Sequence, residues 1–124
     1  MSFEFKWENN NCIFSFRENL DMDGLMEASN LLIGDARFES MEYTIFDLRD
    51  IKKHSLDHND IRIISTIDKG ASRWNKYLKL ACITNDDYTK NIVLDYKKLL
   101  NVADWKIELF ENMDEALTWC RSSS

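Results

Sequence analysis

The stretch Tyr43-Thr-Ile-Phe-Asp-Leu-Arg-Asp-Ile-Lys-Lys-His-Ser-Leu-Asp-His58 decides the fold. It begins with a β-prone apolar run, which predicts a strand over residues 43–46, and passes through a polar turn into a sequence with helical periodicity. In α/β folds, loops at the carboxyl ends of strands commonly carry the functional site. This loop lacks the glycines of a phosphate-binding loop and a nucleophile beside a base. The stretch therefore predicts an α/β fold and the position of a site, but it names no chemistry.

Length and composition indicate one domain spanning residues 1–124. The 124 residues, of which 44% are hydrophobic, can supply a core without a disulfide or a metal. The net charge of -6 argues against general affinity for nucleic acid, which requires Lys and Arg to neutralise phosphates. The sequence has no basic, apolar leader and no apolar run of about 18 residues. We therefore expect a soluble, cytoplasmic protein.

The cysteines do not suggest a cofactor or a catalytic centre. Cys12, Cys82 and Cys120 are odd in number, lie far apart and form no C-x-x-C pair. Cys82 falls in an apolar strand run and Cys120 on an apolar helix face, where thiols are normally inert. We therefore expect buried, reduced thiols and no metal site. Because the sequence also lacks a glycine-rich phosphate loop and a G-x-S-x-G motif, we expect no cofactor and no enzymatic activity.

A hairpin and a helix are predicted before the deciding stretch. Apolar residues alternate over residues 3–7 and again over residues 12–16, and Glu8-Asn-Asn-Asn11 between them has turn chemistry. Apolar residues then recur at helical spacing from Asp21, with Gly34 placed to end the helix.

Strands and helices alternate after the stretch. A helix is predicted from about Leu56 to near Gly70, and an apolar strand follows over residues 78–83. Asn85 is expected to cap the next helix, whose apolar face runs from Tyr88 to Ala103.

The last strand is predicted over residues 105–110, and Asn112-Met-Asp-Glu115 resembles a capping box before a final helix that reaches Cys120. The order is β-β-α-β-α-β-α-β-α. Strands separated by helices require right-handed crossover connections, so the sheet should be parallel apart from the hairpin. The fold class is α/β with a mixed five-stranded sheet, an N-terminal antiparallel hairpin followed by parallel strands.

Two segments carry a resemblance to a known superfamily. With Asp47-Leu-Arg-Asp-Ile51 closing the third strand and Phe110-Glu-Asn-Met-Asp-Glu-Ala-Leu-Thr-Trp119 closing the chain, the sequence resembles the SpoIIAA-like superfamily. These are the STAS domains and the STAS/Sec14-like small bacterial proteins. The resemblance implies a SpoIIAA-like fold and a non-enzymatic regulatory or protein-interaction module related to anti-sigma-factor antagonists.

In those antagonists, an Asp-Ser-Ser/Thr-Gly turn carries a phosphorylated hydroxyl at the start of the second helix. The matching stretch here is Ser55-Leu-Asp-His58, which has Leu56 or Asp57 at the hydroxyl position and His58 at the glycine. Asp57 is then a helix cap or a first-turn acid. The alternatives are that Asp57 stands permanently in place of a phosphate, or that Ser55 is a displaced phosphosite.

The loop from Asp50 to His58 is the expected partner-binding surface, carried by Asp50, His54, Ser55, Asp57 and His58. His54 and His58 are four residues apart, a spacing that can bind a divalent metal on one helix face. His54 should precede the helix, however, so we expect a solvated polar loop rather than a metal site.

A stretch without acids interleaves cations with aromatic residues: Lys69, Arg73, Trp74, Lys76, Tyr77 and Lys79. Cations at the end of a helix complement its dipole, and Trp74 could simply cover the core. The functional alternative is an anionic-ligand patch of Lys69, Arg73, Trp74 and Lys76. Such a patch would bind an anionic lipid headgroup, an acidic partner or single-stranded nucleic acid stacked on the indole.

The second functional hypothesis is a small carrier or sensor of an apolar or lipid-like ligand, since some relatives in the superfamily are linked with such ligands. Packing in the hydrophobic core explains the candidate lining residues of such a ligand site equally well. The candidate lining residues are Met22, Leu25, Met26, Phe3, Phe5, Trp7, Phe14 and Phe16. Homodimerisation through an exposed sheet edge or the aromatic hairpin is also consistent with the sequence.

Overall fold

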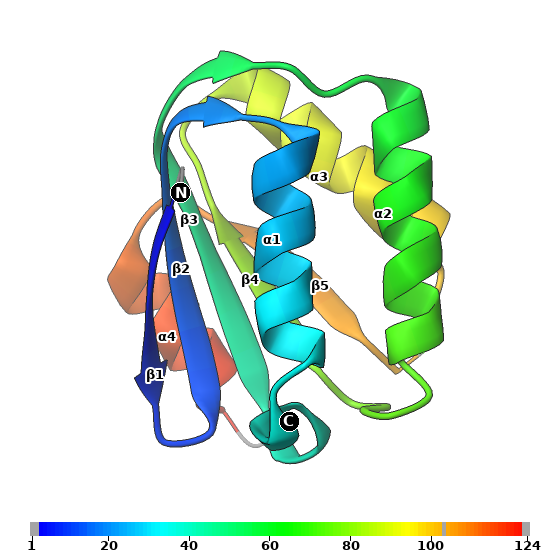
Figure 1. The fold of residues 1–124 in the computed structure, drawn as a ribbon. Coiled ribbons are helices and arrows are strands. Elements are labelled where there is room, and N and C mark those ends of the chain that lie inside the picture. The colour runs from blue at the N-terminus through cyan, green and yellow to red at the C-terminus, as the bar shows by residue number, and fades with distance from the viewer. Residues whose placement is uncertain (1–2, 103, 123–124) are drawn as a thin grey trace.

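The computed structural model describes residues 3–102 and 104–122. Its elements alternate as the sequence predicts, with one short 3-10 helix added before the third strand (Figure 1). They are β1 (Phe3–Glu8), β2 (Asn11–Leu20), α1 (Met22–Ile33), η1 (Ala36–Ser40), β3 (Tyr43–His54), α2 (His58–Ala71), β4 (Lys79–Ile83), α3 (Asp87–Leu100), β5 (Lys106–Phe110) and α4 (Met113–Cys120).

The five strands form one mixed sheet in the order β1-β2-β3-β4-β5. β1 pairs antiparallel with β2, and every later pair of neighbours is parallel. Asn9 occupies the left-handed region, with φ of 56°, in the turn between β1 and β2. The predicted α/β class and the predicted mixed five-stranded sheet are confirmed.

Helices cover both faces of this sheet, α1, α2 and α3 on one side and α4 on the other (Figure 1). In β4, Leu80 and Cys82 pack into the core beneath the three helices. Ala81 and Ile83 pack into the second core, under α4. Because both faces of this central strand are buried, its sequence is a continuous apolar run rather than an alternation.

β3 is longer than predicted, because it continues past residue 46 to His54. Beyond Asp47 it pairs with β2 alone, since β4 ends opposite that residue. β2 is bulged here, and Glu18 has a positive φ of 67°, so the ends of β2 and β3 curve over toward α1 and α2 (Figure 1). The polar turn predicted between the strand and the helix is therefore confined to residues 55–57.

Two helix boundaries also differ from the prediction. Asp86, not Asn85, caps α3, because its carboxylate accepts a hydrogen bond from the backbone N–H of Thr89 at 2.9 Å. α3 ends at Leu100, and Asn101 follows it with a left-handed φ of 44°. Ala103, the predicted last residue of this helix, lies outside the described residues.

Candidate functional site

The loop between β3 and α2 is tied to the end of β2. The backbone N–H of Ser55 donates to the carbonyl of Leu20 at 3.0 Å, and the Ser55 hydroxyl donates to Oδ1 of Asn19 at 3.0 Å. The Ser55 side chain is exposed. The residue proposed as a displaced phosphosite is therefore accessible, but its hydroxyl points to the end of β2 rather than to the start of α2.

Asp57 is the N-cap of α2. Its carboxylate accepts from the backbone N–H of Asp60 at 2.8 Å, and the Asp60 carboxylate accepts from the Asp57 N–H at 3.2 Å, which completes a capping box. The interpretation of Asp57 as a helix cap is confirmed. A carboxylate consequently already satisfies the positive end of this helix.

His54, the last residue of β3, lies beneath the start of α3. Its ring stands 4.5 Å from that of Tyr88, and its Nε2 is 3.3 Å from both Oδ2 of Asp86 and Oγ1 of Thr89. Hydrogen bonds from Thr89, with a smaller contribution from His54, lower the pKa of Asp86. The side chain of His54 is only 17% exposed, so it supports the surface more than it contributes to it.

The two histidines do not converge. His58 is exposed on the first turn of α2, and its Nδ1 lies 2.9 Å from Oδ2 of Asp95 on α3. Each imidazole thus has a different carboxylate partner. Within residues 3–102 and 104–122, no group of three His, Cys, Asp or Glu side chains could hold a metal ion.

The β3–α2 loop and the start of α3 meet at the carboxyl end of the sheet. The hydroxyl of Tyr88 on α3 donates to the carbonyl of Leu56 in the loop at 3.4 Å. We call the exposed side chains of these segments the carboxyl-edge surface: Ser55, Asp57, His58, Asp86, Asp87 and Tyr88. The helical spacing predicted Tyr88 on the apolar face of its helix, but this residue is 50% exposed. The rule that parallel strands end at one edge could have found the α3 residues.

Asp50 is not part of this surface, contrary to the prediction of a loop from Asp50 to His58. It lies within β3, opposite Arg17 of β2. His54 lies four positions further along the strand, which is about 13 Å at the usual rise per residue. Asp50 therefore lies apart from Ser55, Asp57 and His58, with which the sequence grouped it.

The predicted anionic-ligand patch lies at the opposite end of α2. Lys69, Arg73 and Lys76 are exposed, and so are Trp74 at 67% and Tyr77 at 73%. These residues form the end of α2 and the connection to β4, whereas the carboxyl-edge surface is at the start of α2 (Figure 1). Their role in binding an anionic ligand stays a prediction.

Lys79 does not belong to that patch. It is only 8% exposed, and its ammonium donates to the carbonyls of Trp119 and Ser122 at 3.0 and 2.9 Å and to the Ser122 hydroxyl at 3.0 Å. The sequence pattern grouped it with the other cations. Neighbouring residues of a strand point to opposite faces of the sheet, so Lys79 points away from the face on which Leu80 packs. There its hydrogen bonds hold the end of α4.

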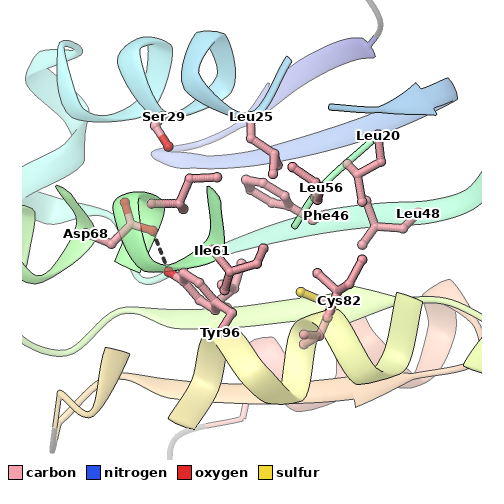
Figure 2. A pocket seen from close by; sticks show the side chains of 14 residues that line it. Leu20, Leu25, Ser29, Phe46, Leu48, Leu56, Ile61, Asp68, Cys82 and Tyr96 are labelled. Carbon is pink, nitrogen blue, oxygen red and sulfur yellow. Dashed lines mark hydrogen bonds between the residues drawn. The ribbon is translucent and has the colours of Figure 1, made fainter. Parts of the chain in front are cut away.

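An apolar cavity of about 80 Å³ lies between the sheet and the three-helix layer (Figure 2). Of the predicted lining residues, Leu25 does line it, whereas Met22, Met26 and the hairpin aromatics do not. The hairpin aromatics instead pack on one another, as Phe14 and Phe16 do within the core. The lining comprises Leu20, Leu25, Ser29, Phe46, Leu48, Leu56, Ile61, Ile64, Asp68, Leu80, Cys82, Ile92, Val93 and Tyr96.

One ionisable pair lines this cavity. The hydroxyl of Tyr96 on α3 donates to Oδ2 of Asp68 on α2 at 2.5 Å (Figure 2). Burial raises the pKa of Asp68 to about 6, against the lowering effect of the Tyr96 hydrogen bond, and burial also raises the pKa of Tyr96. Asp68 was not among the predicted site residues, although it stands four residues after the buried Ile64 on α2.

The three thiols are buried and free, as predicted. Burial raises the pKa of Cys12 and of Cys82 to about 12, and that of Cys120 to about 11. At neutral pH these thiols are protonated and therefore poor nucleophiles. In the part of the chain that the structure describes, no helix has the length and apolar character needed to cross a membrane.

Two solved structures resemble this chain over nearly its whole length. One is an uncharacterised DUF3478-family protein from Shewanella loihica with a SpoIIAA-like fold, at 13% identity and a TM-score of 0.58, covering 95% of this chain and 91% of that chain. This chain has the SpoIIAA-like fold. The other is an anti-sigma factor antagonist from Mycobacterium paratuberculosis, at 14% identity and a TM-score of 0.56, covering 97% and 93%. The sequence matches no family model and no curated protein.

Within this SpoIIAA-like fold, the turn before α2 differs from the phosphorylated turn that the resemblance implied. Asp57 bonds the backbone N–H of Asp60, and Ser55 lies two residues before this cap. A phosphate on Ser55 would lie beside Asn19 at the end of β2 rather than at the start of α2, where the Asp57 carboxylate already caps the helix. The carboxyl-edge surface can thus offer acids and one aromatic ring without any modification.

Proposed function

We propose that the protein is a non-enzymatic regulatory module that binds another protein through the carboxyl-edge surface. The surface is acidic, since Asp57, Asp86 and Asp87 are all exposed there. A basic protein surface is the complementary partner, because opposite charges steer association and fix its register. One structural neighbour is named as an anti-sigma factor antagonist, which supports a protein partner.

The observation that carries the proposal is the position of Tyr88. Its ring is half exposed, lies against the ring of His54, and is held by a hydrogen bond to the Leu56 carbonyl. A tyrosine fixed in this way loses little conformational entropy on binding, and tyrosines are enriched among the residues that dominate binding energy. Phosphorylation is not required, because Asp57 supplies a permanent negative charge at the start of α2.

A quantitative pull-down from a lysate of the native cells tests the proposal. The wild-type protein should retain one partner, and Tyr88→Ala should reduce that partner at least tenfold. Asp57→Asn removes a charge from the surface but keeps a residue that can cap the helix, so it should weaken binding at low salt without unfolding α2.

Trp74→Ala is the matched control, because it also removes an exposed ring but at the other end of α2. Equal retention by Tyr88→Ala and wild type would refute the proposed surface. Loss of the partner with Trp74→Ala alone would instead assign the contact to the anionic-ligand patch.

A second candidate function, binding of a small apolar ligand, is favoured by the cavity of about 80 Å³. Native mass spectrometry of the purified protein tests it directly. A stoichiometric adduct that is lost on denaturation is expected. Homodimerisation stays a prediction, for which the edge of β1 that faces away from β2 offers unpaired backbone groups.

A further inference from the structure

Asp68 lies where two cavities meet. The cavity of about 80 Å³ and a second one of about 30 Å³ share Ser29, Phe46, Asp68, Leu80 and Tyr96 in their linings. The remaining walls of the larger cavity are almost entirely aliphatic and aromatic. A polar point in an otherwise apolar cavity is the usual means by which a small-molecule site fixes the orientation of its ligand.

The carboxylate of Asp68 is half-buried and has one hydrogen-bond partner in the part of the chain that the structure describes. Oδ2 accepts the hydrogen bond from Tyr96, but no cation pairs with Asp68 among residues 3–102 and 104–122. The other titratable groups that line the cavity, Tyr96 from α3 and Cys82 from β4, are neutral at pH 7. A negative charge that is partly withdrawn from water in this way favours any donor that can reach it.

The hydroxyl of Ser29 on α1 lines both cavities and has no hydrogen-bond partner within the described part of the chain. It lies on the wall across from α2 in Figure 2. Asp68, Tyr96 and Ser29 therefore give one carboxylate and two hydroxyl oxygens from three different helices. All of these oxygens can accept a hydrogen bond, and the carboxylate carries a negative charge.

We propose that this cavity binds a small apolar molecule with a hydrogen-bond-donating head, a hydroxyl or an ammonium, which bonds to Asp68, and that it excludes carboxylates. This inference rests on the second candidate function above. The two cavities together hold roughly four groups of the size of water or a methylene. The buried part of the ligand is consequently a short chain or a small ring, in contact with Leu25, Phe46 and Ile61.

A headgroup series at constant chain length tests the proposal. The probes are 1-butanol, n-butylamine and butyrate, each titrated at pH 7.5 into the intact protein while amide and methyl NMR signals are recorded. We expect the alcohol and the amine to shift signals of the cavity-lining residues. Butyrate should bind at least tenfold more weakly, because its carboxylate meets that of Asp68.

Two variants separate headgroup recognition from simple filling of space. Asp68→Asn should abolish the discrimination against butyrate, whereas Asp50→Asn, on exposed β3, should leave it unchanged. Ser29→Ala, a small change on α1, should weaken the alcohol without admitting butyrate. Equal binding of all three probes by the wild type would overturn the headgroup inference and leave ligand binding intact. Absence of cavity shifts with every probe would overturn both.

Discussion

Replacing Asp68 with Asn should stabilise the protein at alkaline pH and have little effect in mild acid. The folded protein raises the pKa of this carboxyl from 3.8 to about 6, chiefly by burial. The folded state therefore holds the proton more tightly than the unfolded state does. The stability associated with this proton is fully present below pH 3.8 and is lost as the pH rises through 6.

The magnitude follows from that pKa difference. At 1.36 kcal/mol for each pKa unit, the ionised carboxylate costs the folded state about 3 kcal/mol. Asn has nearly the shape of the protonated carboxyl, and its amide oxygen can still accept from Tyr96. The gain in unfolding free energy of Asp68→Asn over wild type should consequently increase by about 2.5 kcal/mol between pH 4 and pH 8. For a chain of this length that is roughly 10 °C in Tm.

Urea denaturation at the two pH values, followed by tryptophan fluorescence, measures this difference. Asp50→Asn is the matched control, because Asp50 is exposed on β3 and its variant should stay within about 0.5 kcal/mol of wild type at both pH values. A difference between Asp68→Asn and wild type that does not change with pH would refute the reasoning. A loss of stability at pH 8 would refute it as well.

Two further substitutions test contacts that hold the ends of helices. Asp57→Ala should lower the free energy of unfolding by about 1 kcal/mol, because it removes the α2 cap, and Asp57→Ser should restore most of it; equal urea midpoints for Ala and wild type would contradict the cap. Lys79→Met should cost about 2 kcal/mol, because it removes three hydrogen bonds to the end of α4. Lys76→Met, which changes an exposed lysine, should cost less than about 0.5 kcal/mol in the same urea assay, and equal losses would contradict the role of Lys79.

The elements that pack in the core were predictable from the sequence, because burial imposes a hydrophobic pattern on them. β4 is buried on both faces and reads as a continuous apolar run, and α2 shows its buried stripe from Ile61 to Ala71. The end of β3 has no such hydrophobic pattern. Its residues 49–53 belong to a two-stranded ribbon with little core beneath it, so all of their side chains are polar except that of Ile51, which packs against the edge of the core. A strand of this kind is indistinguishable from a polar loop by hydrophobic pattern alone.

The candidate sites were predictable where they follow from topology and not where they follow from packing. The β3–α2 loop was found because strands of a parallel sheet end at one edge. Tyr88 was assigned to the core because its spacing on α3 fits the apolar stripe, yet it lies in the first turn of the helix, where it is 50% exposed. Asp68 was passed over because a count of apolar residues ignores one acid among them. The cavity depends on how α1, α2 and α3 pack on the sheet, which no single segment encodes.

Leu56 connects the two proposed functions. Its side chain lines the cavity, and its carbonyl accepts the hydrogen bond from Tyr88 on the carboxyl-edge surface. A ligand that displaces Leu56 would also move the carbonyl that holds the exposed ring of Tyr88, on which the proposed partner binding depends. If the ligand changes the affinity for the partner by some factor, the partner must change the affinity for the ligand by the same factor. A module with these two sites could therefore sense a small molecule and report it to a protein through one residue of the β3–α2 loop.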